Sequence, residues 1–121
     1  MAYNSPFQPQ GNTVSLTTSG TASTSQSRQV TAANFGVQNF PQSVRIANPG
    51  SAIVWISFTL ATATLTIPTA GTTTAGTPQP CFPLLPGVVE VFTLPAGPVV
   101  FVNDISTGTS QTYHITAGEG M

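Results

Sequence analysis

Charge is the property that this sequence has least of. Two of its 121 residues are arginine, none is lysine and three are acidic, so charged residues make up 4% of the chain, against roughly 25% in an ordinary soluble domain. Phosphate groups are bound mainly by Lys and Arg side chains, and the same side chains hold proteins on acidic membrane surfaces. The composition therefore argues against a nucleic-acid partner and against a membrane partner.

The low charge also bears on association. A net charge of −1 leaves little repulsion between copies, and proteins of low net charge tend to associate. Thr and Ser supply 20 and 11 residues, so the surface must be hydroxyl-rich rather than ionic. We therefore expect the protein to work in an assembled state.

Metal ligands and nucleophiles are equally scarce, since the chain has one cysteine and one histidine. Cys81 permits no disulfide within the chain and is expected to be a small buried hydrophobe, with a reactive thiol as the alternative. One His and one Cys fall short of a metal site, and no glycine pattern cradles a phosphate, so no cofactor is expected. His114 and Asp104 could be drawn with a serine as a triad, but no G-x-S-x-G motif is present. We expect no enzyme, and a structural or interfacial His114.

Long hydrophobic runs are missing as well. The most apolar window, residues 88–102, is interrupted by Glu90 and by the prolines and glycine of residues 95–98, so it does not predict a membrane span. Residues 1–10 have neither a basic nor an apolar region and do not predict a secretory signal.

What the sequence does have is a pattern of short strands, and residues 43–60 are its centre. Val44 and Ile46 alternate with Arg45, which is the period of a half-buried strand. After the turn signal at 48–51, residues 53–58 are apolar on both faces, as in a central strand covered on both sides. Asn-Pro-Gly-Ser fits turn types that match hairpin twist poorly, so this connection is expected to carry a bulge or to link two sheets.

Other short segments extend this pattern. Strands are predicted near residues 29–32, 61–67, 88–94, 99–102 and 112–116, with a loop over 69–80 and another over 103–110. Residues 88–94 are apolar on both faces except for Glu90. Pro and Gly turns separate the segments and no convincing helix occurs. Six to eight such strands predict an all-β fold, an antiparallel β-sandwich or jelly roll, formed by residues 28–121 as one domain.

Residues 1–27 differ from the rest of the chain. They are rich in Ser, Thr, Gln and Gly, and only Val14 and Leu16 suggest a strand. Such a segment is either a floppy tail or an extended arm that becomes ordered by adding to the sheet edge of a neighbour. The arm is favoured, and a chain lacking residues 2–27 is then expected to remain folded.

The few charged residues are candidates for structural roles. An unpaired buried guanidinium is costly, so Arg45 either faces solvent or meets a carboxylate, such as Glu90, in the domain or on a partner. Glu90 and Asp104 could also approach each other if their strands are adjacent. Trp55 is a candidate core or interface anchor, with the core favoured. The candidate interface residues are Tyr3, Phe7, Val14, Leu16, Arg28, Arg45 and Trp55.

Residues 43–121 resemble the small β proteins found in the head-gene regions of tailed bacteriophages. The stretches that carry this resemblance are VRIANPGSAIVWISF, LLPGVVEVFTLPAGPVVFV and the ending TYHITAGEGM. Separately, residues 8–12 (QPQGN) resemble part of the N-terminal arm of lambda-type head decoration proteins, although the sequence that follows departs from that family.

The resemblance implies a virion structural protein, namely a decoration or cement protein that is assembled in the host cytoplasm and stabilises the outside of an icosahedral head. It implies the major capsid protein and other copies of the chain, as a dimer or trimer, as partners, and it implies no catalytic residues. The alternatives are a tail, collar or fibre-base component, a glycan- or receptor-binding module, and a soluble cytoplasmic binding domain.

Overall fold

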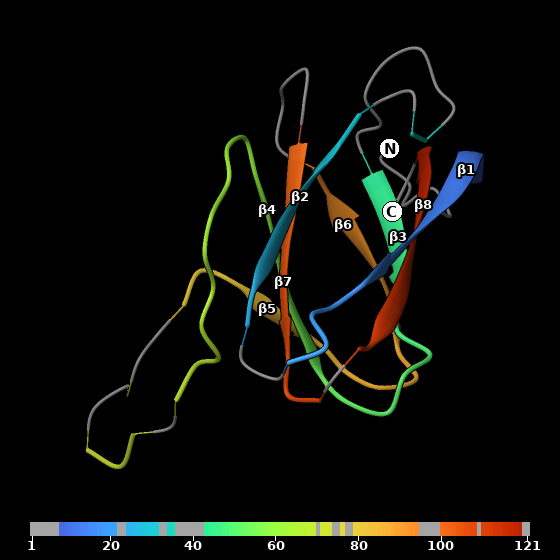
Figure 1. Cartoon of the computed structure of the whole chain (residues 1–121). Coiled ribbons are helices and arrows are strands. Elements are labelled where there is room, and N and C mark those ends of the chain that lie inside the picture. The colour runs from blue at the N-terminus through green and yellow to red at the C-terminus, as the bar shows by residue number, and fades with distance from the viewer. Residues whose placement is uncertain are drawn as a thin grey trace, which may run out of the picture.

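A computed structural model of the chain describes residues 8–21, 24–31, 34–35, 43–69, 71–73, 76, 79–94, 100–108 and 110–119. The described residues contain eight strands and no helix (Figure 1). The strands are β1 (Gln8–Thr17), β2 (Gln26–Val30), β3 (Ser43–Ala47), β4 (Val54–Thr59), β5 (Phe82–Leu84), β6 (Val89–Thr93), β7 (Val100–Ser106) and β8 (Thr112–Glu119). The prediction of an all-β fold is confirmed.

The strands form two four-stranded sheets, in the orders β1-β8-β3-β6 and β2-β7-β4-β5. Every pairing is antiparallel, and β1 pairs with β8, β2 with β7, β3 with β6 and β4 with β5. The chain thus resembles one long two-stranded ribbon that is folded over on itself, which is the arrangement of a jelly roll. Of the two predicted architectures, the strand order selects the jelly roll.

The hydrophobic core lies between the two sheets. Val44 and Ile46 of β3 are fully buried while Arg45 between them is exposed, which confirms the predicted alternation. Val54 and Ile56 of β4 are buried in the same cluster. The remaining buried members are Val30, Phe35, Leu84, Leu94, Val100, Val102, Tyr113, Ile115 and Ala117.

The turn after β3 carries the chain from one sheet to the other, as one of the two alternatives for this turn predicted. Asn48 is 1% exposed, and its Nδ2 donates hydrogen bonds to the carbonyl oxygens of Ala52 (3.0 Å) and Leu84 (2.9 Å). The backbone N–H of Gly50 donates to Asn48 Oδ1 at 3.0 Å. One buried amide side chain therefore joins this turn to strand β5.

Strand β7 is longer than predicted. Residues 103–106 were expected in a loop, but they continue the strand and are buried. Ser27 Oγ donates to Asn103 Oδ1 (2.6 Å), and Asn103 Nδ2 donates to Ser57 Oγ (3.1 Å). The prediction was wrong because these polar side chains, which are typical of loops, are satisfied here by partners on the two neighbouring strands.

The expected strand over residues 61–67 is also wrong, because this segment forms no strand. It runs beside β2, where the backbone N–H groups of Ala63 and Leu65 donate to the hydroxyls of Ser27 (3.4 Å) and Ser25 (3.2 Å). Leu65 and Ile105 are buried but do not belong to the cluster between the sheets. The second sheet therefore has buried apolar side chains outside the main core, as expected for a sheet covered on both sides.

Strand β6 lies at a sheet edge and is less buried than its sequence predicted. It is the last strand in the order β1-β8-β3-β6. Val89 is 46% exposed and Glu90 is exposed. The apolar residues of this strand thus include some that face away from the core.

The other edge of the same sheet is β1, which comes from the segment that the sequence assigned to an arm. Residues 8–17 pair with β8 of the same chain, with a register shift between Pro9 and Thr13. The boundary expected at residue 27 falls inside β2 (Gln26–Val30). In this structure the polar segment is therefore an edge strand of the domain over residues 8–17.

Candidate functional site

The five predicted interface residues that the structure describes do not form one surface. Val14 and Leu16 are half-buried and pack against the core, so they stabilise the attachment of β1. Tyr3 and Phe7 lie outside the described residues.

Arg45 and Trp55 lie on different sheets. Arg45 is exposed on β3, and no ion pair links it to Glu90, although the two strands are neighbours. Trp55 is half-buried on β4 and is not a member of the core cluster, because Val54 and Ile56 on either side of it point inward. The favoured core position of Trp55 is therefore wrong, and its buried Nε1 has no hydrogen-bond partner among the residues that the structure describes.

Arg28, the seventh candidate, belongs to a buried polar cluster between the sheets, which we call the inter-sheet cluster (Arg28, Asp104 and Tyr113). Asp104 Oδ2 accepts hydrogen bonds from Arg28 Nη2 and from the Tyr113 hydroxyl. The side chain of Asp104 is 0% exposed and that of Arg28 is 28% exposed. Arg28 Nη1 also donates to the Thr17 carbonyl oxygen at 2.6 Å. The cluster therefore connects β2 and β7 of one sheet with β8 of the other.

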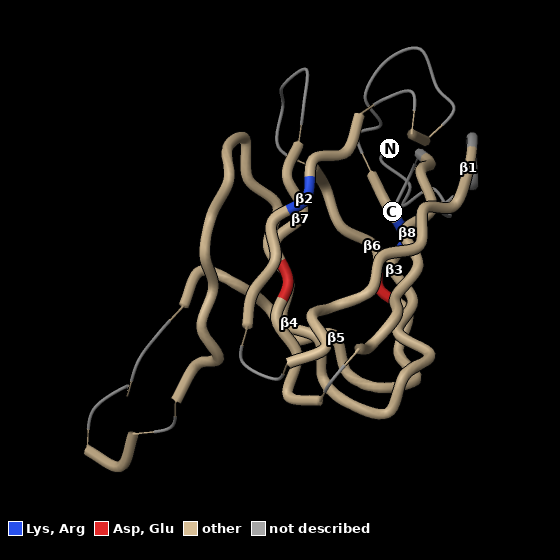
Figure 2. The backbone as a smooth tube through the Cα atoms, viewed as in Figure 1, with Lys and Arg blue, Asp and Glu red and all other residues tan. Residues whose placement is uncertain are grey.

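This arrangement replaces the carboxylate pair that was considered for Asp104 and Glu90. The two residues lie on β7 and β6, which belong to different sheets. A single carboxylate held by an arginine and a tyrosine is typical of a structural ion pair rather than of paired acid and base groups. Figure 2 shows how few charged residues the backbone carries.

Burial dominates the titration of the inter-sheet cluster. Desolvation raises the pKa of Asp104, although the hydrogen bond from Tyr113 and the charge and hydrogen bond of Arg28 oppose this rise. Burial, and then the negative charge of Asp104, raise the pKa of Tyr113 well above its usual value. Tyr113 therefore stays protonated and acts as a hydrogen-bond donor.

The raised pKa of Asp104 predicts a pH dependence of stability. The folded chain holds the proton of Asp104 more tightly than the unfolded chain. The resulting contribution to the free energy of unfolding is fully present below the unfolded pKa of about 3.9 and is lost as pH rises through the folded pKa. The free energy of unfolding of the wild type should thus fall, relative to an Asp104→Asn variant, as pH rises from about 4 to about 7. Urea unfolding of both chains at a series of pH values measures this. A wild type that becomes more stable relative to the Asp104→Asn variant as pH rises would contradict the prediction.

The outer face of the β1-β8-β3-β6 sheet carries rows of hydroxyl groups. Thr13 Oγ1 and Thr116 Oγ1 lie 2.8 Å apart, and Thr17 Oγ1 and Thr112 Oγ1 lie 2.9 Å apart. Arg45 is opposite Thr116 in the register of β3 and β8 and supplies a positive charge. We call the exposed and half-buried outward side chains of β1, β8 and β3 the hydroxyl face; they are Thr13, Ser15, Thr17, Thr112, His114, Thr116, Arg45 and Ala47.

His114 lies in the middle of the hydroxyl face. Its Nδ1 is 2.7 Å from Ser15 Oγ. Among the described residues no carboxylate is hydrogen-bonded to His114, and Asp104 is engaged in the inter-sheet cluster instead. The imagined triad is therefore not assembled in the described part of the chain.

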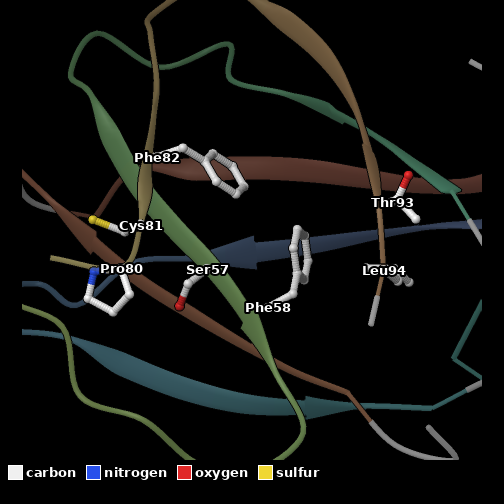
Figure 3. A pocket seen from close by; sticks show the side chains of 7 residues that line it. All are labelled: Ser57, Phe58, Pro80, Cys81, Phe82, Thr93 and Leu94. Atoms are coloured by element: carbon white, nitrogen blue, oxygen red, sulfur yellow. The ribbon is translucent and has the colours of Figure 1, made fainter. Parts of the chain in front are cut away.

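A pocket of about 470 Å³ opens at the side of the sandwich, where β5 and β6 are the edge strands. It is lined by Ser57 and Phe58 of β4, Pro80 and Cys81 ahead of β5, Phe82 of β5, and Thr93 and Leu94 at the end of β6. Figure 3 shows the rings of Phe58 and Phe82 pointing into the space between β4 and β6. Phe82 also stacks on Phe92, with ring centroids 4.1 Å apart. We call this site the edge pocket.

No known family, curated protein or solved structure matches this chain. Within the described ranges, no group of three or more His, Cys, Asp or Glu residues could hold a metal ion. No helix that could cross a membrane occurs in the part of the chain that the structure describes. The site must therefore be interpreted from its own residues.

Sequence reasoning missed the edge pocket and the inter-sheet cluster. The seven pocket residues come from three separate stretches of the chain, so no local motif marks them. For the inter-sheet cluster the one signal was the pairing of rare charges, since Arg28 and Asp104 are two of only five charged residues. The spacing of these two residues gave no reason to prefer one partner over another.

Proposed function

We propose that this protein is a virion structural protein, a decoration or cement protein that binds the outside of an icosahedral phage head. It would stabilise the head through contacts with the major capsid protein and with other copies of itself. The observation that carries the proposal is the hydroxyl face, an open sheet face with hydroxyls where most soluble domains carry charges.

The physical argument concerns the cost of burying this face. Removing ions from water is expensive unless each is paired, whereas hydroxyl groups exchange water for protein partners at small net cost. On the hydroxyl face Arg45 is the one formally charged side chain. Such a face can be covered by a partner over a wide area, with a single cation for a capsid carboxylate to meet.

The fold supports the proposal by analogy alone. Jelly rolls occur in viral capsid proteins and also in lectins, and a fold does not assign a function. The hydroxyl face contains no Phe, Trp or Tyr, and the rings of these residues are what a glycan-binding face would be expected to offer. The glycan-binding alternative therefore has less support than a protein partner. The proposal includes no catalytic step.

Co-sedimentation with phage heads that lack the protein tests this proposal. The wild type should bind saturably and raise the survival of heads on heating. Thr13→Lys places an ammonium group on the exposed hydroxyl face and should weaken binding about tenfold or more. The matched control Thr72→Lys puts the same charge on an exposed loop residue between β4 and β5 and should bind like the wild type.

Two outcomes would overturn the proposal in different ways. Equal binding of Thr13→Lys and the wild type would remove the hydroxyl face from the contact. The absence of saturable binding by the wild type would overturn the head role, and binding to tails or to a glycan array would then identify the alternative.

A further inference from the structure

The edge pocket exists because neighbouring strands differ in length. Strand β4 covers Val54–Thr59, but β5 pairs with it only over Val54–Ile56. Beyond Ile56 no residue of β5 pairs with β4. The rings of Phe58 and Phe82 line the resulting gap together with Leu94. The size, about 470 Å³, falls within the range of sites that take small molecules and leaves room for a large side chain.

The lining of the edge pocket defines what would fill it. It includes two aromatic rings, a leucine, a proline and a cysteine, with Ser57 and Thr93 as its hydroxyl residues and no charged residue. An aromatic or aliphatic group would remove its apolar surface from water here, and no charge would be left unpaired. The matching occupant is an uncharged aromatic side chain.

The segment that precedes β1 carries such side chains. Residues 1–7 read MAYNSPF, with two aromatic rings and no charged side chain. In the register, Pro9 lies opposite Gly118, Gly118 opposite Ser43, and Ser43 opposite Thr93. The start of β1 and the rim of the edge pocket are therefore at the same end of the sheet.

The distance across the sheet decides which copy could supply the ring. β1 and β6 are three strand spacings apart in the sheet order, which is about 14 Å. Gln8 is still paired with Glu119 of β8, so Phe7 is one residue beyond a fixed position, and one residue spans about 4 Å at most. Even with the length of its side chain, Phe7 therefore falls short of the edge pocket of its own chain, whereas Phe7 of a second copy docked at this end of the sandwich meets no such limit.

We infer that the edge pocket is a docking site for the Phe7 side chain of a second copy of this chain. This contact is one of the subunit-bridging contacts of the proposed function. It rests on that function only in requiring that two copies of the chain meet. The Phe7 ring of the second copy fills the space between Phe58 and Phe82 and provides the specificity of the contact.

Cys81 reports directly on occupancy, because it lines the edge pocket and is the one cysteine of the chain. Burial raises the pKa of its thiol, so alkylation is best followed at about pH 9, where enough thiolate is present. From about 1 μM to about 1 mM protein, the alkylation rate of the wild type should fall about tenfold. Phe7→Ala should show no such fall, while Phe7→Trp and the control Asn4→Ala should both keep it.

A second measurement keeps the Phe7 ring in place. In a Pro6→Cys variant under mild oxidation, the introduced thiol should form a disulfide with Cys81 of another copy, giving a covalent oligomer whose cross-link is mapped by mass spectrometry. Protection of Cys81 that is independent of concentration, or that survives Phe7→Ala, would overturn the inference. So would uniform labelling at every concentration. These measurements use no phage heads, so their failure is distinct from a failure to bind heads.

Discussion

Replacing Asp104 with alanine should lower the free energy of unfolding by about 3 kcal/mol, the lower end of the range for breaking a buried ion pair. The Tyr113 hydroxyl, on a side chain that is 0% exposed, loses its acceptor, and Arg28 loses its carboxylate. The lower end applies because the Arg28 side chain is 28% exposed. For a domain of this size the thermal midpoint should fall by about 10 °C, as measured by calorimetry.

The same cluster gives a sharper comparison. In an Arg28→Met, Asp104→Leu, Tyr113→Phe variant no member of the cluster keeps a polar side chain, and most of the lost stability should return, because a buried ion pair can often be replaced by packed apolar residues. Arg45→Ala, which removes an exposed charge, is the matched control and should change stability by less than about 0.5 kcal/mol. If the triple variant is as unstable as Asp104→Ala, lost packing rather than unpaired polar groups explains the effect.

Removal of strand β1 should have an even larger effect. A chain lacking residues 2–17 loses the whole strand and leaves the edge of β8 unpaired. It also loses the contacts of the half-buried Val14 and Leu16 with the core, each worth part of the about 1.5–3 kcal/mol that a fully buried side chain contributes. Total stabilities are about 5–15 kcal/mol, so we expect loss of cooperative unfolding in urea, followed by circular dichroism, and aggregation through the exposed strand.

A chain lacking only residues 2–7 is the control for this deletion and should keep a cooperative transition. The sequence alone predicted that even a chain lacking residues 2–27 would remain folded. From the structure we expect the opposite outcome, since the longer deletion removes β1 and the first residues of β2. A cooperative transition in the chain lacking residues 2–17 would show that β1 is dispensable and would restore the interpretation as an arm.

The sequence by itself determined the fold class and the central strands. The alternation of Val44 and Ile46 with Arg45 placed β3 and its buried face correctly, because a period of two has one structural meaning in a short segment. The apolar run after the turn likewise located β4. The prediction that neither a nucleic acid nor a membrane is a partner rests on the low charge, which is a property of the composition alone.

Only the tertiary structure decided where the polar residues go. Asn103 and Asp104 look like loop residues until Ser27, Arg28 and Tyr113 are placed around them. The sequence around Val14 and Leu16 fits an arm and an edge strand equally well. It becomes an edge strand because β8 offers an edge with which it pairs. The edge pocket follows from the three-residue length of β5 beside a longer β4. Each of these features depends on which strands become neighbours, and local sequence patterns do not encode that choice.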